Sequence, residues 1–389
     1  MNTMSDASKL GMGDSMPSPE PAAGPHTADP PAPEHPRERT AWQLRDQARS
    51  CAAMGSPLYG HLLERAAEDC AAGGVTWRVL EAEAGPGRAG ALALRFMAAV
   101  HRLVLDGGAP GLAAFYPSMG GSGALDGAWA AFAATLADHA DTLARSVRRP
   151  CQTNEVGRSA GLMVAFLEVA ARTGLPLRLR EVGASAGLNL RCDRFHIGGG
   201  GAAVGDPASP VDLSGHWTVP PPHDGPITVV DRRGCDRAPV DPTTARGQLA
   251  LSASVWADQR ARLARLRGAI ALARRHPVAV DRAPLDVWTE RQVETLEPGT
   301  ATVVFHSVVA EYLPDATRAR FVGALAAAGV RATADHPLAW VRLEPISSLR
   351  HHGVQLTLWP GGDTRTLARC GAHGTDVEWL VGDKPVPQG

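Results

Sequence analysis

The residues with the clearest potential for chemistry lie in the stretch LRLREVGASAGLNLRCDRF, residues 177–195. Alternating apolar and charged residues lead to Glu181 and then to a small-residue turn. Gly183, Ser185 and Gly187 match the G-x-S-x-G pattern in which a hydrolase exposes its nucleophilic serine. With Glu181 two positions before the first glycine, the same residues match the glycine-rich turn by which a Rossmann-type sheet holds a nucleotide or S-adenosylmethionine. One pattern therefore leaves two chemistries open.

In the nucleotide interpretation, small residues over 183–187 let the backbone approach a ligand, and the amides that open a helix over 187–193 face it. Glu181 would bind a cationic or hydroxyl group, because a carboxylate in an apolar strand is costly unless it is satisfied. The alternative is a tight strand–helix turn in which Glu181 pairs with an arginine.

The hydrolase interpretation needs an acid and a histidine from later strand ends. It is weaker because the turn follows the first predicted strand, whereas a nucleophile elbow has several strands and an oxyanion loop before it. The available partners are Asp281, Asp286, His306, His336 and His373.

Two later strand ends carry further candidates. The second strand ends on Asp236, whose carboxylate can accept hydrogen bonds from ribose hydroxyls, with Asp231 as the competing residue. The segment VVFHSVVAEYL, residues 303–313, gathers His306, Ser307, Glu311 and Tyr312 around a strand-to-helix edge. His306 is the first candidate for a general base there, although packing residues of this kind are common.

Upstream, CQTNEVGRSAG begins a predicted helix over 154–173, capped by Thr153 or Asn154. Asn154, Glu155 and Arg158 share its first turn. They form either a capping cluster or a set of substrate contacts.

The elements that must position these residues change character near residue 175. Helical periodicity dominates before it, and short β-branched runs alternate with helices after it. This alternation predicts an α/β fold, with a Rossmann-like, mostly parallel sheet flanked by helices and preceded by an all-helical subdomain. We expect a disordered Pro/Ala-rich tail at 1–36, a helical subdomain at 37–174 and the α/β domain at 175–389, with a Gly/Pro-rich insertion at 196–225.

The element boundaries follow from the same periodicity. Predicted helices span 39–53, 58–72, 75–83, 89–106, 126–146, 154–173, 187–193, 246–275, 285–296 and 314–328, and predicted strands span 177–183, 226–236, 276–281, 300–307, 338–345, 353–360 and 376–382.

Composition narrows the class of protein. The net charge of −1 gives no general attraction to nucleic acid or to a membrane surface. The six cysteines are scattered, which favours reduced thiols in a cytoplasmic protein, and no metal is expected, although Cys370 and His373 have a possible ligand spacing. Without a signal peptide or a long apolar run, we expect a cytoplasmic protein that acts on a small molecule.

Several long motifs resemble one family. These are TNEVGRSA, REVGASAGLNL, GCDRAPVD, VWADQRARLARLRGAIALAR, VFHSVVAEYL and CGAHGTDVEWL. From about residue 40 to 382 the chain resembles a bacterial family, domain of unknown function 2332, common in actinobacteria. The resemblance implies no assigned activity.

The core of that family in turn looks like a class I S-adenosylmethionine-dependent methyltransferase. This resemblance implies that the turn holds the cofactor, that Asp236 binds its ribose and that Asp281 with Arg282 lies at the adenine edge. It places His306 and Ser307 on the substrate side. The implied turn residues are Glu181, Gly183, Ser185, Gly187 and Asn189. Ser185 departs from the family pattern, where a glycine stands, and the 196–225 insertion stretches the first connection.

The leading hypothesis is therefore an S-adenosylmethionine-binding methyltransferase, with Asn154, Glu155, Arg158 and Tyr312 as substrate contacts. A Ser185 hydrolase and a non-catalytic binding module of the same fold are the alternatives.

Overall fold

The computed structural model describes residues 33–84, 91–348 and 351–380. Most of the predicted tail at 1–36 lies outside these ranges. No helix in the described ranges combines the length and apolar character needed to cross a membrane.

The described residues before Leu177 form helices. The longer predicted helices occur with small shifts at their ends, but the one expected over 126–146 is two helices that meet at His139, whose φ of −123° is not helical. The elements are α1 (Pro36–Ala53), α2 (Pro57–Ala71), α3 (Val75–Leu80), η1 (Glu81–Glu83), α4 (Leu92–Leu105), α5 (Pro110–Ala113), η2 (Pro117–Met119), α6 (Ala128–Asp138), α7 (Ala140–Val147), η3 (Val156–Arg158) and α8 (Ser159–Thr173).

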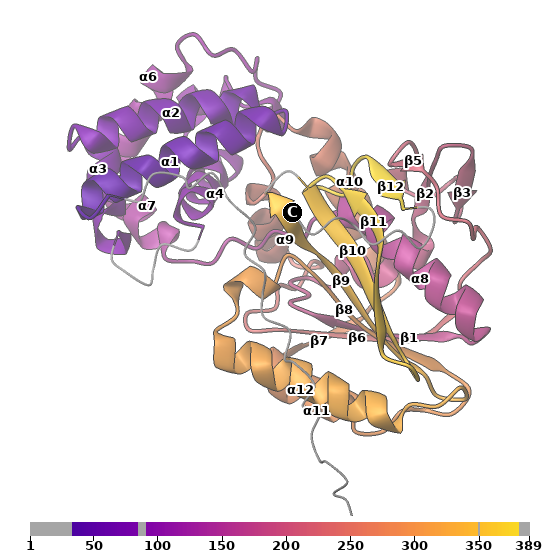
Figure 1. The fold of residues 1–389 in the computed structure, drawn as a ribbon. Helices are drawn as coiled ribbons and strands as arrows, with labels where there is room; N and C mark the ends of the chain where they lie inside the picture. The colour runs from indigo at the N-terminus through magenta and orange to yellow at the C-terminus, as the bar shows by residue number, and fades with distance from the viewer. Residues whose placement is uncertain (1–32, 85–90, 349–350, 381–389) are drawn as a thin grey trace, which may run out of the picture. The chain divides into compact units, whose positions relative to one another are not determined.

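The rest of the described chain is built around a nine-stranded sheet in the order β5-β12-β11-β10-β9-β8-β1-β6-β7 (Figure 1). Its strands are β1 (Leu177–Val182), β5 (Trp217–Val219), β6 (Val229–Asp236), β7 (Ala279–Arg282), β8 (Ala301–Ser307), β9 (Leu338–Ser348), β10 (His351–Trp359), β11 (Asp363–Cys370) and β12 (Val377–Trp379).

The order of the parallel strands has a Rossmann-like topology. Taken along the chain, β1, β6, β7, β8 and β9 are arranged 3-2-1-4-5 and pair in parallel throughout. The chain moves outward from β1 to β7 and then returns to β8 on the other side of β1. In such sheets ligands bind outside the carboxyl ends of the strands at this reversal.

The sheet continues with antiparallel strands beyond β9. β10 returns against β9, and β11 then returns against β10, a strand that periodicity did not predict. The insertion at 196–225 forms a small sheet and also adds β5 beside β12. The strands of the small sheet are β2 (His196–Gly199), β3 (Ala202–Val204) and β4 (Asp212–Leu213).

The helices that connect these strands also depart from the predictions in two places. The helix expected over 246–275 is interrupted over 254–259, where Asp258 accepts hydrogen bonds from the Ser56 hydroxyl and the Leu58 amide. The helix expected over 187–193 is a 3₁₀ segment with non-helical φ and ψ at Arg191. The elements are η4 (Leu188–Arg194), α9 (Ala245–Ala253), α10 (Arg260–Arg275), α11 (Leu285–Gln292), η5 (Ala310–Tyr312) and α12 (Asp315–Arg331).

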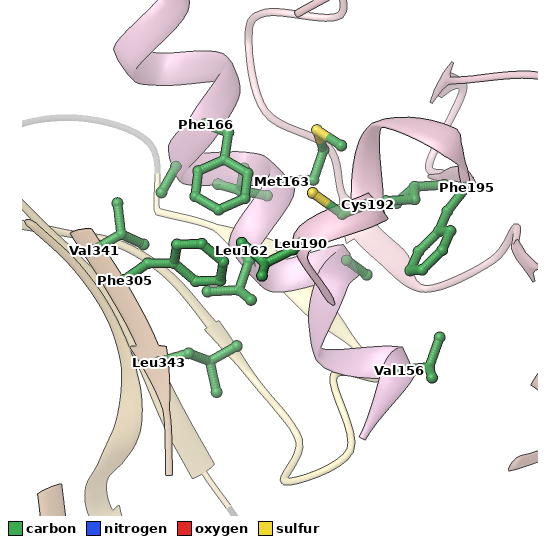
Figure 2. Packing of buried hydrophobic residues seen from close by; sticks show 14 of the residues in the cluster. Val156, Leu162, Met163, Phe166, Leu190, Cys192, Phe195, Phe305, Val341 and Leu343 are labelled. Carbon is green, nitrogen blue, oxygen red and sulfur yellow. The ribbon is translucent and has the colours of Figure 1, made fainter. Parts of the chain in front are cut away.

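Apolar side chains cover both faces of β1 and β8, in the middle of the sheet. On one face α8 packs against the strands, and Phe166 meets Phe305 of β8 edge to face at 5.1 Å between ring centroids (Figure 2). On the other face α11 and α12 contribute Trp288 and Phe321 to a second cluster with Val304. Strands that are buried on both faces read as the apolar runs seen in the sequence.

Candidate functional site

A cavity of about 690 Å³ lies where β1, β6 and β8 reach their carboxyl ends. Gly183, Asp236 and Ser307, at or just after the ends of these strands, all line it. Its position is the strand-order reversal at which ligands of such sheets bind, and its size is that of small-molecule and cofactor sites. The topology therefore brings part of the predicted site together.

The amides of the turn after β1 are satisfied within the protein. Each of the five N–H groups from Ala184 to Leu188 donates to an acceptor of the chain itself. The acceptors are Cys235 O for Ala184 (2.9 Å), Asp236 Oδ2 for Ser185 (2.9 Å), Asn154 Oδ1 for Ala186 (3.2 Å) and Leu188 (3.0 Å), and Ala184 O for Gly187 (2.7 Å).

This bonding corrects the prediction that the turn presents its amides to a ligand. Asn154 Oδ1 occupies the position that an anionic ligand would take at a helix N-terminus. The segment that follows is a 3₁₀ turn, so no α-helix N-terminus faces the cavity at this point. A ligand at this wall therefore does not have the amides of residues 184–188 available.

Glu181 is buried beneath the turn and is absent from the cavity lining. Burial raises the pKa of its carboxyl to about 8, although Arg191 nearby opposes that rise and Asn189 donates a hydrogen bond. Its Oε2 has no partner among the described residues. Glu181 therefore does not reach the cavity to contact a cofactor, and it forms no ion pair within 4 Å among the described residues. It is a buried carboxyl that is predominantly neutral near pH 7.

Ser185 has the strained backbone of a nucleophile elbow but not its partners. Its φ is +52°, a conformation that non-glycine residues rarely adopt. Its hydroxyl donates to Gln152 Oε1 at 2.7 Å, and the next amide, which would complete an oxyanion hole, is held by Asn154. Among the five proposed acid and histidine partners, only His373 lines the cavity. The described geometry thus argues against the hydrolase.

Asp236 lines the cavity at the end of β6, as its proposed role requires. Oδ2 accepts from the Ser185 amide and Oδ1 from the Ala238 amide at 2.8 Å. Each carboxylate oxygen has a second lone pair, so both can still accept from a ligand hydroxyl. The competing residue Asp231 pairs with Arg180 instead.

The other predicted cofactor residues lie off the cavity lining. Asp281 accepts two hydrogen bonds from Arg233 and one from Trp288 Nε1, and the bond from Arg233 lowers its pKa. Asn189 is buried and accepts from the Ser159 hydroxyl at 3.0 Å. Gly187 has a positive φ of 63° that the turn requires, and a Cβ there would lie 2.8 Å from Val280.

His306 is a packing residue in this structure. It is buried against Phe321, its Nδ1 lies 2.6 Å from Glu344 Oε1, and its Nε2 accepts from Trp340 Nε1 at 3.2 Å. Both ring nitrogens are therefore engaged, and the side chain is absent from the cavity lining. This arrangement argues against the predicted general base.

Glu344 connects His306 to the segment that lines the cavity after β8. Its Oε1 also accepts from the amides of Val309 (3.0 Å) and Ala310 (3.4 Å). Val308 in the same segment has φ +56°, and a β-branched residue in that region is strained. Ser307 and Tyr312 line the cavity here, and their role on the substrate side stays a prediction.

The cluster at the start of α8 has three separate roles. Asn154 holds the turn, whereas Glu155 is buried and caps Gly157 N at 3.1 Å. Burial acts to raise the pKa of Glu155, but the Arg262 guanidinium outweighs it and lowers that pKa to about 2. Arg158 is the only member of this cluster that lines the cavity in the described structure.

Two histidines on the lining were not assigned to the substrate pocket from the sequence. His352 is the second residue of β10, and because β10 is antiparallel to β9, it lies at the same sheet edge as the carboxyl end of β9. His373 stacks edge to face on Trp256 at 5.3 Å. Burial lowers the pKa of His352 to about 4 and that of His373 to about 3, so both rings are neutral at pH 7. No local motif marks His352, since only the hairpin brings it here.

The chain belongs to the DUF2332 family, described as uncharacterised proteins conserved in bacteria, whose family model matches residues 41–379. No curated protein matches the chain. No solved structure matches it either. Among the described residues, no group of three or more His, Cys, Asp or Glu side chains is placed to hold a metal ion.

Proposed function

We propose that this member of the DUF2332 family binds S-adenosylmethionine in the cavity and transfers its methyl group to a small molecule. The observation that carries the proposal is the coincidence of three features: the 3-2-1-4-5 strand order, a cavity at its reversal and a carboxylate at the end of the second parallel strand. This is the arrangement in which Rossmann-type sheets bind the ribose of a cofactor.

The residues present fit the cofactor on one side of the site. Asp236 keeps acceptor capacity for ribose hydroxyls, and Gly183 and Ser185 provide a wall of small side chains beside it. The turn amides do not contribute, because all five from 184 to 188 are bonded within the chain. Glu181 supports the turn from below and is not assigned a contact with the cofactor.

When bound, the cofactor would supply an electrophilic methyl group on a sulfonium centre. The chain's own contribution is to exclude water and to align an acceptor, and alignment can supply a large part of the barrier reduction in a bimolecular step. Ser307 and Tyr312 lie on the wall where an acceptor would be held. His352 lines the same cavity, whereas His306 does not.

The test is a calorimetric titration of the full chain with S-adenosylhomocysteine. We expect saturable binding in the wild type and a loss of about tenfold or more in Asp236→Ala, because charge-assisted hydrogen bonds to hydroxyls are lost. Asp281→Ala is the matched control, since its carboxylate ends the neighbouring strand β7 but lies off the cavity. Thermal unfolding of both variants separates lost contacts from misfolding.

Absence of binding to a folded wild-type sample would contradict the proposal. Labelling by a fluorophosphonate that Ser185→Ala abolishes would favour the hydrolase instead. Binding without turnover of any acceptor tried would leave a binding module of the same fold.

A further inference from the structure

Arg158 differs from the other cavity-lining arginines in what holds its charge. Its Nε donates to the carbonyl of Ala372 at 3.0 Å and its Nη1 to that of Ser307 at 3.4 Å. These neutral acceptors fix the guanidinium without cancelling its charge. In the described part of the chain, no carboxylate oxygen lies within 4 Å of the Arg158 guanidinium. Its Nη2 has no hydrogen-bond partner there and remains accessible to solvent.

Two neighbouring arginines on the lining are neutralised by carboxylates. Arg262 pairs with Glu155 at 2.5 Å, with both side chains buried, and Arg95 pairs with Glu83 at 2.9 Å. Arg237 is exposed, so water solvates its charge. Arg158 is thus a half-buried cation that the protein has oriented but not paired, because Glu155 and Glu344 act on its charge only from beyond ion-pair distance.

His352 provides a second unsatisfied group on the same lining. Only 2% of its surface is exposed, and its Nδ1 has no hydrogen-bond partner among the described residues. A buried polar atom without a partner costs free energy that a ligand can recover. Asp236, the carboxylate on the cavity lining, lies at the end of β6, which is two strands away from β8 in the sheet. Arg158 is bound instead by the carbonyl of Ser307, the last residue of β8.

We infer that the cavity contains an oxyanion subsite formed by Arg158 and His352, and that the methyl acceptor carries a carboxylate or a phosphate. The inference about the acceptor rests on the proposed function, whereas the subsite itself does not. Arginine suits both groups because its planar fork donates two parallel hydrogen bonds. A ligand anion at this position would neutralise the guanidinium charge of Arg158, which the two carbonyl groups do not.

The experiment titrates the full chain calorimetrically with benzoate, phenyl phosphate and the neutral isostere benzamide. We expect at least one anion to bind about tenfold or more tightly than benzamide, since one charge-assisted pair is worth that ratio. The preferred anion identifies the source, carboxylate or phosphate. Arg158→Met should abolish the preference. Arg282→Met is the matched control, because Arg282 also donates to a backbone carbonyl at this sheet edge but lies off the cavity.

Two outcomes would overturn the inference. Equal binding of benzamide and both anions, or no anion binding up to about 10 mM, would remove the subsite. Competition between the preferred anion and S-adenosylhomocysteine, with weaker S-adenosylhomocysteine binding in Arg158→Met, would assign Arg158 to the cofactor's own carboxylate and not to the acceptor. An anion preference in a protein that does not bind S-adenosylhomocysteine would keep the subsite and reject the methyltransferase.

Discussion

The turn after β1 and the segment after β8 line the same cavity, but their polar groups are occupied to different degrees. At the turn, Asn154 and Asp236 take up amides that a nucleotide-binding turn would offer to its ligand. Around the other segment, Arg158 lacks a carboxylate and His352 lacks a partner on Nδ1. The comparison teaches that the most recognisable motif has a largely structural role and that, apart from Asp236, the open hydrogen-bonding capacity lies around the neighbouring segment after β8.

The largest effect on the free energy of unfolding is expected at Glu181, which is buried beneath the turn after β1. The pKa of its carboxyl is about 8 in the folded chain against 4.5 ordinarily, so the folded state retains a proton that the unfolded state releases. The contribution of Glu181 to the free energy of unfolding should therefore fall as pH rises from about 4.5 to 8, by at most about 5 kcal/mol. Glu181→Gln removes this titration, so the free energy of unfolding of the wild type minus that of the variant, measured by urea unfolding, should fall across that pH range. Parallel profiles for the two proteins would contradict the buried neutral carboxyl.

A smaller effect is expected from opening the turn itself. Asn154→Ala leaves the amides of Ala186 and Leu188 without their acceptor, which should cost about 2–4 kcal/mol in the free energy of unfolding. Asn154→Asp keeps an oxygen at that position and should lose much less. Chemical denaturation of the three proteins measures the difference. If Asn154→Ala and Asn154→Asp destabilised the protein equally, the hydrogen bonds to Oδ1 would not be what stabilises the turn.

The smallest effect on the free energy of unfolding is expected at Val308, in the segment after β8. Its φ of +56° costs a β-branched residue about 1–3 kcal/mol, and glycine adopts it freely at a smaller entropic cost. Val308→Gly should therefore stabilise the protein by about 1 kcal/mol, the difference between these terms. Val309→Gly is the matched control and should destabilise it, because Val309 has an ordinary φ of −121° and packs against Gly183. A destabilised Val308→Gly in thermal unfolding would show that its side-chain contacts outweigh the strain.

Much of the architecture follows from local patterns. Apolar runs locate all five parallel strands, and their alternation with helices implies parallel pairing, because such connections must cross over. Asp236 and Ser307 could be placed at strand ends, and hence near a common edge, on the same grounds. The breaks in the helices could not be read in this way. The interruption over 254–259 coincides with Asp258, whose carboxylate binds Ser56 and Leu58 about 200 positions away.

The amino-acid sequence by itself determined the α/β class, the family and the strand ends that meet at one edge, because periodicity and motif spacing are local properties. Only the tertiary structure decided which polar groups remain available. Asn154 occupies the turn amides across a separation of more than 30 residues, Glu344 and Trp340 engage both nitrogens of His306, and the β9–β10 hairpin brings His352 to the cavity. Hydrogen-bond capacity is shared between groups that meet only in the folded chain, so a motif cannot reveal whether its donors are already used.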